Sequence, residues 1–167
     1  TSAAVSVTVS NGPPAGTTLV GTSTVSTSVD SNPAGTAEAF KATAVAAGPL
    51  ASFRLYLDTG STATSVIVGV YTDNAGHPGT LLTQATIAAP VKAAWNTVSV
   101  PVAQVANGTS YWLALLTPVG GGTVKFRDRP SGGTAETSSQ TNLTSLPATW
   151  SRGTTYNDGS FSAYGTS

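Results

Sequence analysis

The stretch from Val66 to Leu82 constrains the fold most, because an apolar run enters a polar turn and a second run follows it. Val66, Val68 and Val70 fall on one face of an extended chain, since side chains alternate along a strand. The intervening segment 73–79 is rich in residues that adopt positive φ, bond their own backbone or preset φ. The pattern predicts a strand, a tight reversal and a second strand.

The same alternation recurs along the chain, with short turn-rich gaps and no convincing helix between the runs. In the segment 50–58, Phe53, Leu55 and Leu57 share one face and polar side chains share the other. The Ala-rich window 36–47 allows a helix by composition, but its alternation favours a strand. Further strands are expected over residues 17–29, 80–88, 94–100, 109–117, 123–129 and 160–164. The pattern predicts an all-β fold, an antiparallel β-sandwich of jelly-roll type.

The chain of 167 residues is long enough for one domain with its own core. Residues 1–16 end in the turn-forming run Asn-Gly-Pro-Pro-Ala-Gly, and we expect them to be a linker or the tail of an upstream domain. Residues 17–167 would then form a single β-sandwich module. After Arg129 the chain becomes rich in Ser, Thr and Gly, and so long a loop in a compact domain is usually functional or packed across an edge.

Composition excludes several classes of partner. Charged residues make up only 8% of the chain and the formal net charge is +0, so the surface offers no attraction to phosphate backbones or anionic lipids. This argues against nucleic-acid and membrane-surface partners, and no apolar run is long enough to span a membrane. Cysteine and methionine are both absent, which removes disulfides and thiol chemistry and suits an oxidising, extracellular setting. We therefore expect a secreted or cell-surface protein.

Two segments carry a family resemblance. Residues 69–82 read Gly-Val-Tyr-Thr-Asp-Asn-Ala-Gly-His-Pro-Gly-Thr-Leu-Leu, and residues 108–115 read Gly-Thr-Ser-Tyr-Trp-Leu-Ala-Leu. With them, the region 37–128 resembles bacterial jelly-roll accessory modules, which include choice-of-anchor-type surface domains and carbohydrate-binding-module-like appendages of secreted enzymes. The resemblance implies a non-catalytic module of exported multidomain proteins, with other domains of the parent polypeptide as partners. The region 130–158 matches no family pattern.

The inventory of catalytic groups is poor. His77 is the only histidine, and its turn offers no carboxylate at a spacing that would orient it. A glycosidase needs two facing carboxylates. Asp58 and Asp128 each end a predicted strand, but nothing in the sequence indicates that they meet. We therefore expect no enzyme activity.

Aromatic and hydrogen-bonding groups suit a sugar ligand, because sugars offer apolar C–H faces to rings and hydroxyls to Arg, Asp and Asn. Arg54 and Tyr56 lie on the polar face of one predicted strand, and Arg127 and Arg129 flank Asp128 in another. If these strands are neighbours, the side chains line one ligand-binding surface. Pairing of the arginines with carboxylates is the alternative.

The loop-rich region near the C-terminus holds three more candidate ligand residues, Trp150, Arg152 and Tyr156. Arg152 beside Trp150 offers stacking or hydrogen bonding to a ligand, while burial of Trp150 under the loop is the alternative. Trp95 and Trp112 lie inside strands beside apolar neighbours, so we expect both in the core.

Oxygen ligands for a metal gather around Asp30, where the segment 30–35 reads Asp-Ser-Asn-Pro-Ala-Gly and Glu38 follows. Ca²⁺ requires only clustered carboxylates and carbonyls, so Asp30, Asn32 and Glu38 are candidate ligands of a structural Ca²⁺. The pair at 73–74 is a second such turn. Asx-turn hydrogen bonds account for both turns without an ion.

These features favour a non-catalytic extracellular module that binds polysaccharide or another cell-surface glycan and thereby targets its parent protein. A structural spacer or adhesin domain of a bacterial surface protein is the alternative. An exposed Tyr or Trp beside Arg and Asp would favour binding, whereas a sheet face closed by loops would favour the spacer.

Overall fold

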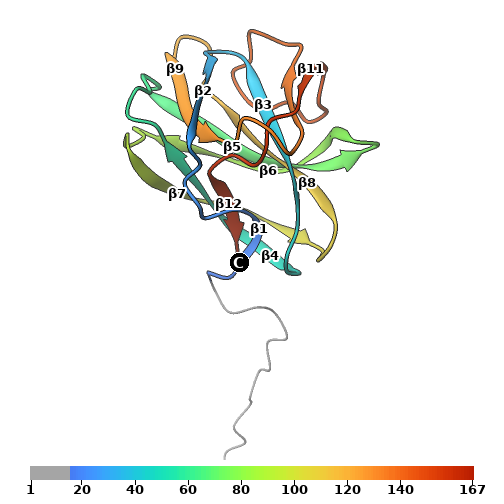
Figure 1. Ribbon diagram of the computed structural model, residues 1–167. Coiled ribbons are helices and arrows are strands. Elements are labelled where there is room, and N and C mark those ends of the chain that lie inside the picture. Colours follow the sequence, from blue (N-terminus) through green and yellow to red (C-terminus); the bar gives the residue numbers. More distant parts are fainter. Residues whose placement is uncertain (1–15) are drawn as a thin grey trace, which may run out of the picture.

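A computed structural model describes residues 16–167, so the linker or tail expected at residues 1–16 lies, apart from Gly16, outside the described residues. Residues 16–167 form strands and no helix, and therefore contain no helix that could cross a membrane (Figure 1). The strands of this part are β1 (Thr18–Gly21), β2 (Ser28–Pro33), β3 (Ala37–Thr43), β4 (Gly48–Leu57), β5 (Ser65–Asn74), β6 (His77–Ala88), β7 (Ala94–Val105), β8 (Ser110–Leu116), β9 (Thr123–Asp128), β10 (Ala135–Ser138), β11 (Arg152–Tyr156) and β12 (Ala163–Thr166).

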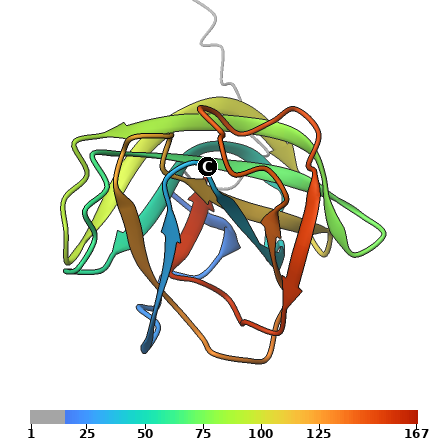
Figure 2. The same cartoon turned by 90° about the horizontal axis from the view of Figure 1, so that it is seen from above.

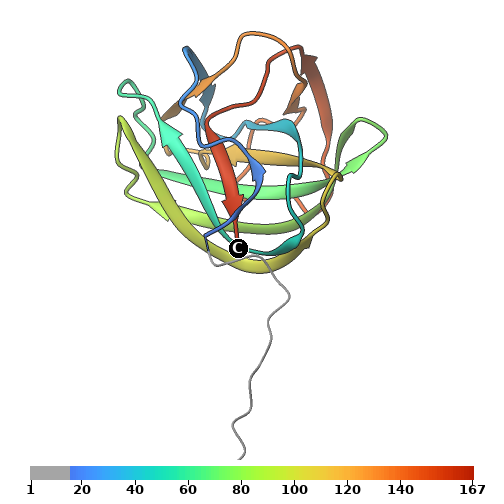
Figure 3. The same ribbon diagram turned by 60° about the horizontal axis from the view of Figure 1, so that its bottom comes forward.

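The strands form two antiparallel sheets, as predicted. The first sheet has the order β1-β12-β4-β9-β2, with β7 paired to β4 as well, and the second has the order β11-β10-β3-β8-β5-β6. Because β6 lies beside β7, the sheets meet along one side, where the green and olive strands curve around the core (Figure 3). On the opposite side no strand pairing within residues 16–167 joins β2 to β11, the light-blue and red-orange edges in Figure 2. We call this the open side.

The main core fills the space between the sheets, and strand alternation supplies it. The ring of Phe40 stacks on Phe161 at a centroid distance of 4.5 Å and meets the ring of Phe126 edge-on at 5.7 Å. Leu55 of β4 is fully buried among them in the same cluster. Burial of each such side chain contributes about 1.5–3 kcal/mol, which makes this cluster the main source of stability.

A second apolar cluster lies on the outer face of the second sheet, under the segment that joins β10 to β11. The side chains of Trp112 and Tyr71 project from the sheet on this side, and Leu146 and Trp150 of the segment cover them. The rings of Tyr71 and Trp150 meet edge-on at 5.2 Å, and the Tyr71 hydroxyl donates to the Pro147 carbonyl at 2.8 Å. The long polar loop is therefore packed across a sheet face, and Trp112 is in a core, as predicted.

The structure confirms that the Ala-rich window is a strand, and it corrects three local predictions. Asp30–Pro33 belongs to β2, and the expected turn begins only after Pro33, where Gly35 has a φ of 88°. Trp95 does not lie in the core, because it is on the outer face of β7 and partly exposed. The strands β10 and β11 are absent from the sequence prediction because their short polar segments show no apolar alternation.

Replacing Trp150 with alanine should reduce the free energy of unfolding by about 3–5 kcal/mol. The indole ring is 5% exposed, and its N–H donates to the buried carboxylate of Glu136 at 3.0 Å, so both packing and a hydrogen bond are lost. Urea unfolding followed by circular dichroism measures the change. The matched control is Trp95→Ala, which removes a partly exposed ring and should cost about 1–2 kcal/mol. Equal losses in the two variants would contradict this placement of the two rings.

Candidate functional site

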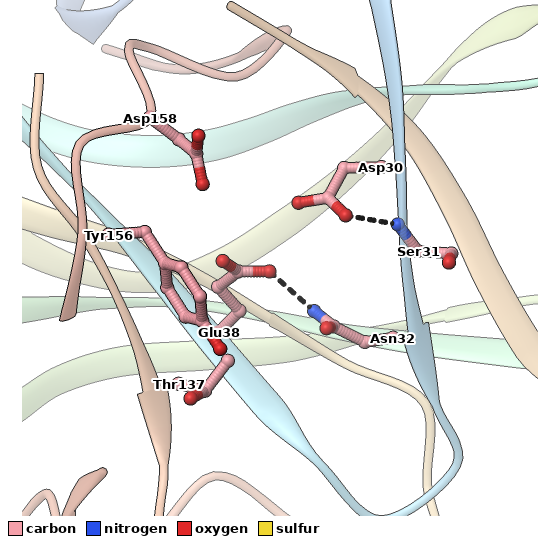
Figure 4. Close-up of a pocket in the computed structure, with 7 residues that line it drawn as sticks. All are labelled: Asp30, Ser31, Asn32, Glu38, Thr137, Tyr156 and Asp158. Carbon is pink, nitrogen blue, oxygen red and sulfur yellow. Dashed lines mark hydrogen bonds between the residues drawn. The ribbon is translucent and has the colours of Figure 1, made fainter. Parts of the chain in front are cut away.

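A cleft lies on the open side, between the edges of the two sheets. We call it the acidic cleft, and its lining residues include Asp30, Ser31, Asn32, Glu38, Asp128, Thr137, Tyr156 and Asp158. The carboxyl groups of Asp30, Glu38 and Asp158 point toward a common space, with the ring of Tyr156 beside it (Figure 4). This part of the cleft has a volume of about 180 Å³, which corresponds to about six water molecules.

Strand alternation places most of these acids inside the sandwich rather than on its surface. Asp128 is two residues after Phe126, so it shares the inward face of β9 with that core side chain. β2 pairs with β9 in a register that puts Asp30 opposite Phe126, and Asp30 therefore also faces inward. Asp158 comes from the segment after β11, which completes the group from the other sheet's edge.

Asp30, Asp128 and Asp158 form an acidic triad, in which each carboxylate places an oxygen within 4.8 Å of the other two. Burial, and then the charges of Asp30 and Asp158, raise the pKa of Asp128 to about 6. Burial and the charge of Asp30 also raise the pKa of Asp158. Three carboxylates held so close together repel one another unless a cation lies between them, so the triad could hold a metal ion.

The acids of the cleft differ from the other acids of the chain in their partners. Of the seven carboxylates, Asp58 pairs with Arg127, Asp73 with Lys41 and Glu136 with His77. The remaining four, which are Asp30, Glu38, Asp128 and Asp158, have no cationic side chain within 4.0 Å in residues 16–167. Negative charge is therefore collected at one place in a chain whose formal net charge is +0.

Asp128 has weaker hydrogen-bonding partners than the other buried acids, Glu38, Asp58 and Glu136. Its side chain is 3% exposed, yet within the described part of the chain its carboxylate accepts a hydrogen bond only from its own backbone amide. Buried charged groups normally have an ion-pair partner or several hydrogen bonds. A cation in the cleft would supply what this carboxylate lacks.

Glu38 lies deeper in the cleft, is 2% exposed, and accepts a hydrogen bond from the Asn32 side-chain amide at 2.8 Å. Burial raises its pKa to about 8 despite that hydrogen bond, and the charges of Asp30 and Asp158 contribute to the rise. Glu38 therefore carries a proton at neutral pH. Of the three residues predicted as metal ligands, the structure places Asp30 in the triad and joins Asn32 and Glu38 to each other instead.

The outer face of the first sheet carries a second group of candidate residues, Arg54, Tyr56, Trp95 and Tyr164, which we call the aromatic face. Trp95 lies opposite Tyr56 in the pairing of β7 with β4, and their rings meet edge-on at 5.6 Å. Tyr164 lies 5.3 Å from Trp95 on the other side, and its hydroxyl oxygen lies 3.1 Å from Arg54 Nη1, which donates to it. All four side chains are partly exposed, so sequence alternation located Arg54 and Tyr56 correctly on an outer face.

The predicted cluster of Arg127, Asp128 and Arg129 is divided between two faces, because neighbouring residues of a strand point in opposite directions. Arg127 lies on the outer face, where its Nε and Nη2 each lie 2.7 Å from Asp58 Oδ2. Asp128 lies inside the cleft. Arg129 is exposed at the end of β9, with its side chain against the backbone of Gly159. The arginine pairing that we left open as an alternative is thus found for Arg127.

The three candidate ligand residues predicted in the loop-rich region, Trp150, Arg152 and Tyr156, do not lie in one site. Trp150 is buried, so the expectation that it offers a ring to a ligand is wrong. Arg152 is exposed on β11, and its guanidinium lies 3.5 Å from the Asn74 carbonyl. Tyr156 is 42% exposed and lines the acidic cleft. Of the three residues, the structure brings only Tyr156 into a cleft.

His77 has a partner that its sequence neighbourhood did not indicate. Its Nδ1 lies 2.5 Å from Oε2 of Glu136, which is 59 residues away in the sequence and 1% exposed. Glu136 also accepts hydrogen bonds from Trp150 and Thr155, so it joins the β5–β6 hairpin to β10 and β11. These contacts explain the pair as a structural tie.

The comparisons with known proteins leave the family open: no family model and no curated protein matches the chain. The two antiparallel sheets agree with the fold that the resemblance to jelly-roll accessory modules implies. The family and the activity that the resemblance implies stay predictions.

In protein freed of divalent ions, replacing Glu38 with glutamine should flatten the dependence of stability on pH. The folded-state pKa of about 8 lies above the ordinary 4.5, so the stabilisation from protonated Glu38 is complete below about pH 4.5 and is lost as the pH rises through about 8. The loss has a slope of up to about 1.4 kcal/mol per pH unit. Glutamine can still accept the Asn32 amide proton but does not titrate. Thermal unfolding from about pH 5 to about pH 9 measures the slope, and an unchanged slope in Glu38→Gln would contradict the assignment.

Proposed function

We propose that the chain is a non-catalytic, extracellular β-sandwich module that binds a polysaccharide or another glycan through the aromatic face, and whose acidic cleft holds a structural Ca²⁺ ion. The observation that carries the binding proposal is the cluster of partly exposed Tyr56, Trp95 and Tyr164 rings beside Arg54. The three rings lie partly exposed on the outer face of the first sheet. Their exposure is what a stacking surface for sugars requires.

Arg54 supports the same proposal. Its Cζ lies 5.7 Å from the centre of the Tyr164 ring, which holds the guanidinium over the aromatic face. Its Nε is buried and has no hydrogen-bond partner among the described residues, and only Nη1 is used, by the Tyr164 hydroxyl. A guanidinium has five N–H donors, so several remain for the hydroxyls of a ligand.

The Ca²⁺ proposal follows from the geometry and chemistry of the triad. Ca²⁺ binds oxygen at about 2.3–2.6 Å, so two oxygens on one ion lie at most about 5 Å apart. The triad oxygens, all within 4.8 Å of one another, meet that limit. Mg²⁺, with distances of about 2.0–2.1 Å, requires a tighter group. An ion there would join β2 and β9 of one sheet to the segment after β11 and thereby close the open side.

Two observations favour other functions. The segment between β10 and β11 closes the outer face of the second sheet, which is what we expect of a structural spacer or adhesin domain of a surface protein. A protonated Glu38 beside Asp30 and Asp158 is the arrangement that would favour a glycoside hydrolase, which needs an acid and a second carboxylate across the bond. Release of reducing ends from a bound polysaccharide by the wild type but not by Glu38→Gln would establish the hydrolase.

Replacing Trp95 with alanine should weaken glycan binding by at least about 10-fold, because a central aromatic side chain of the aromatic face is lost. Affinity electrophoresis in gels that contain soluble glucans, xylan or mannan measures this, and pull-down on cellulose and chitin covers insoluble ligands. Trp95→Phe is the matched control and should keep most of the affinity. Wild-type binding by both Trp95→Ala and Tyr56→Ala would exclude this face, and absence of binding to every glycan would favour the spacer.

Ca²⁺ at about 100 times its Kd should stabilise the protein by about 2.7 kcal/mol and raise the Tm by about 5–10 °C. Asp158→Asn should raise the Tm in EDTA, because it removes a negative charge that burial and the charge of Asp30 disfavour. In CaCl₂ the same variant should no longer show the rise in Tm, because it has lost one ligand of the ion. Differential scanning calorimetry with EDTA and with CaCl₂ measures both. The control Asp73→Asn makes the same charge change at an acid paired with Lys41, outside the cleft, and should keep the Ca²⁺ effect. A Tm that is indifferent to Ca²⁺ in the wild type would refute the ion.

A further inference from the structure

An ion in the acidic cleft would have free coordination positions. Ca²⁺ binds six to eight oxygens, whereas the triad supplies three carboxylates, so one-oxygen binding by each leaves about three positions or more. The other acid of the cleft, Glu38, lies outside the triad and accepts a hydrogen bond from the Asn32 side-chain amide at 2.8 Å. The remaining positions belong to water or to the hydroxyls of a ligand.

The triad has a buried end and an open end. Asp128 is 3% exposed and has no partner beyond its own amide in the described residues, so it marks the buried end of the site. Asp30 and Asp158 are partly exposed and also line the cavity of about 180 Å³ in Figure 4. The free positions of an ion would therefore face this cavity and the adjoining pocket of about 210 Å³, which all three acids of the triad line.

The wall of that cavity includes Tyr156, whose side chain is 42% exposed and whose ring lies beside Asp158 and Glu38 in Figure 4. Thr137 and Ser31 line the same cavity with hydroxyl-bearing side chains. An apolar ring next to a set of oxygen ligands matches the two surfaces of a sugar, which are its C–H face and its hydroxyls.

The charge of the cleft restricts the ligand further. Three carboxylates around one divalent ion leave a net negative charge, which disfavours phosphate, sulfate and uronate ligands. A neutral sugar with two adjacent hydroxyls can occupy two coordination positions of the ion without adding charge. A cationic ligand would bind best without the ion, and this difference can be measured.

From this arrangement we infer that the acidic cleft is a Ca²⁺-dependent sugar site, in which two adjacent hydroxyls of a neutral glycan residue bind the ion held by Asp30, Asp128 and Asp158 while the sugar ring lies against Tyr156. The inference rests on the Ca²⁺ part of the proposed function and gives the ion a second role, as part of the ligand site. It is independent of the aromatic face.

The test measures the binding of metal and sugar separately on the full chain. Calorimetric titration with CaCl₂ gives the Ca²⁺ affinity. Titration with methyl mannoside, methyl galactoside and methyl glucoside, in CaCl₂ and in EDTA, then gives the sugar affinity. We expect Ca²⁺ to bind the wild type, at least one of the glycosides to bind in CaCl₂, and its affinity to fall by at least about 10-fold in EDTA.

Three variants separate the two roles. Tyr156→Ala should weaken glycoside binding by about 10-fold and leave the Ca²⁺ affinity unchanged, because Tyr156 contacts the sugar only. Tyr156→Phe keeps the ring and should bind the glycoside nearly as well as the wild type. Asp128→Asn should weaken both Ca²⁺ and glycoside binding.

Each contrary result has a distinct meaning. Glycan binding that is equal in CaCl₂ and EDTA and is lost only in Trp95→Ala overturns this inference and leaves the aromatic face as the binding surface. Unchanged glycoside binding by Tyr156→Ala, or stronger binding in EDTA, also overturns it. Ca²⁺ binding without binding of any of the three glycosides leaves a purely structural ion and overturns the sugar site. No Ca²⁺ binding by the wild type overturns the ion and the inference together, without affecting the aromatic face.

Discussion

Side-chain alternation along β5 and β8 is the constraint on which the arrangement of surfaces depends, because these strands are apolar on both faces. One face supplies the core between the sheets, and the other carries Tyr71 and Trp112, whose side chains are fully buried. The segment between β10 and β11 covers them with Leu146 and Trp150. This segment covers the outer face of the second sheet, whereas the aromatic face and the open side carry the two candidate sites.

The open side is where the energetic conflicts of the chain are concentrated. Elsewhere Asp58 and Asp73 each pair with a cationic side chain and Glu136 pairs with His77, whereas four acids share the acidic cleft with no cationic side chain within 4.0 Å in the described residues. In a chain with 8% charged residues, such a concentration of like charge costs stability unless a cation compensates it. The cleft and the aromatic face therefore differ in kind: one gathers carboxylates that could hold a metal ion, and the other presents rings that are already packed against each other.

The sequence pattern indicated two of the three acids of the triad but not the third. Asp128 lies two residues after Phe126, so alternation alone predicts that it faces inward with that core side chain. Its neighbours Arg127 and Arg129 suggested a surface cluster instead. Asp30 was identified from its oxygen-rich neighbourhood. Asp158 was not, because it lies in a polar segment with no periodicity, and only the path of the chain after β11 brings it to β2 and β9.

The two tryptophans show the same division. Trp95 has apolar neighbours and lies at the surface, while Trp150 lies in a polar loop and is buried. The sequence by itself determined the strands with apolar alternation, their inward and outward faces and the absence of a helical body, because these follow from local alternation and turn chemistry, but it did not indicate β10 and β11. Only the tertiary structure decided which outer face is covered, which acids meet and which rings stay exposed. These depend on contacts between segments far apart in the chain, such as that of His77 with Glu136, 59 positions later, and local propensity does not encode them.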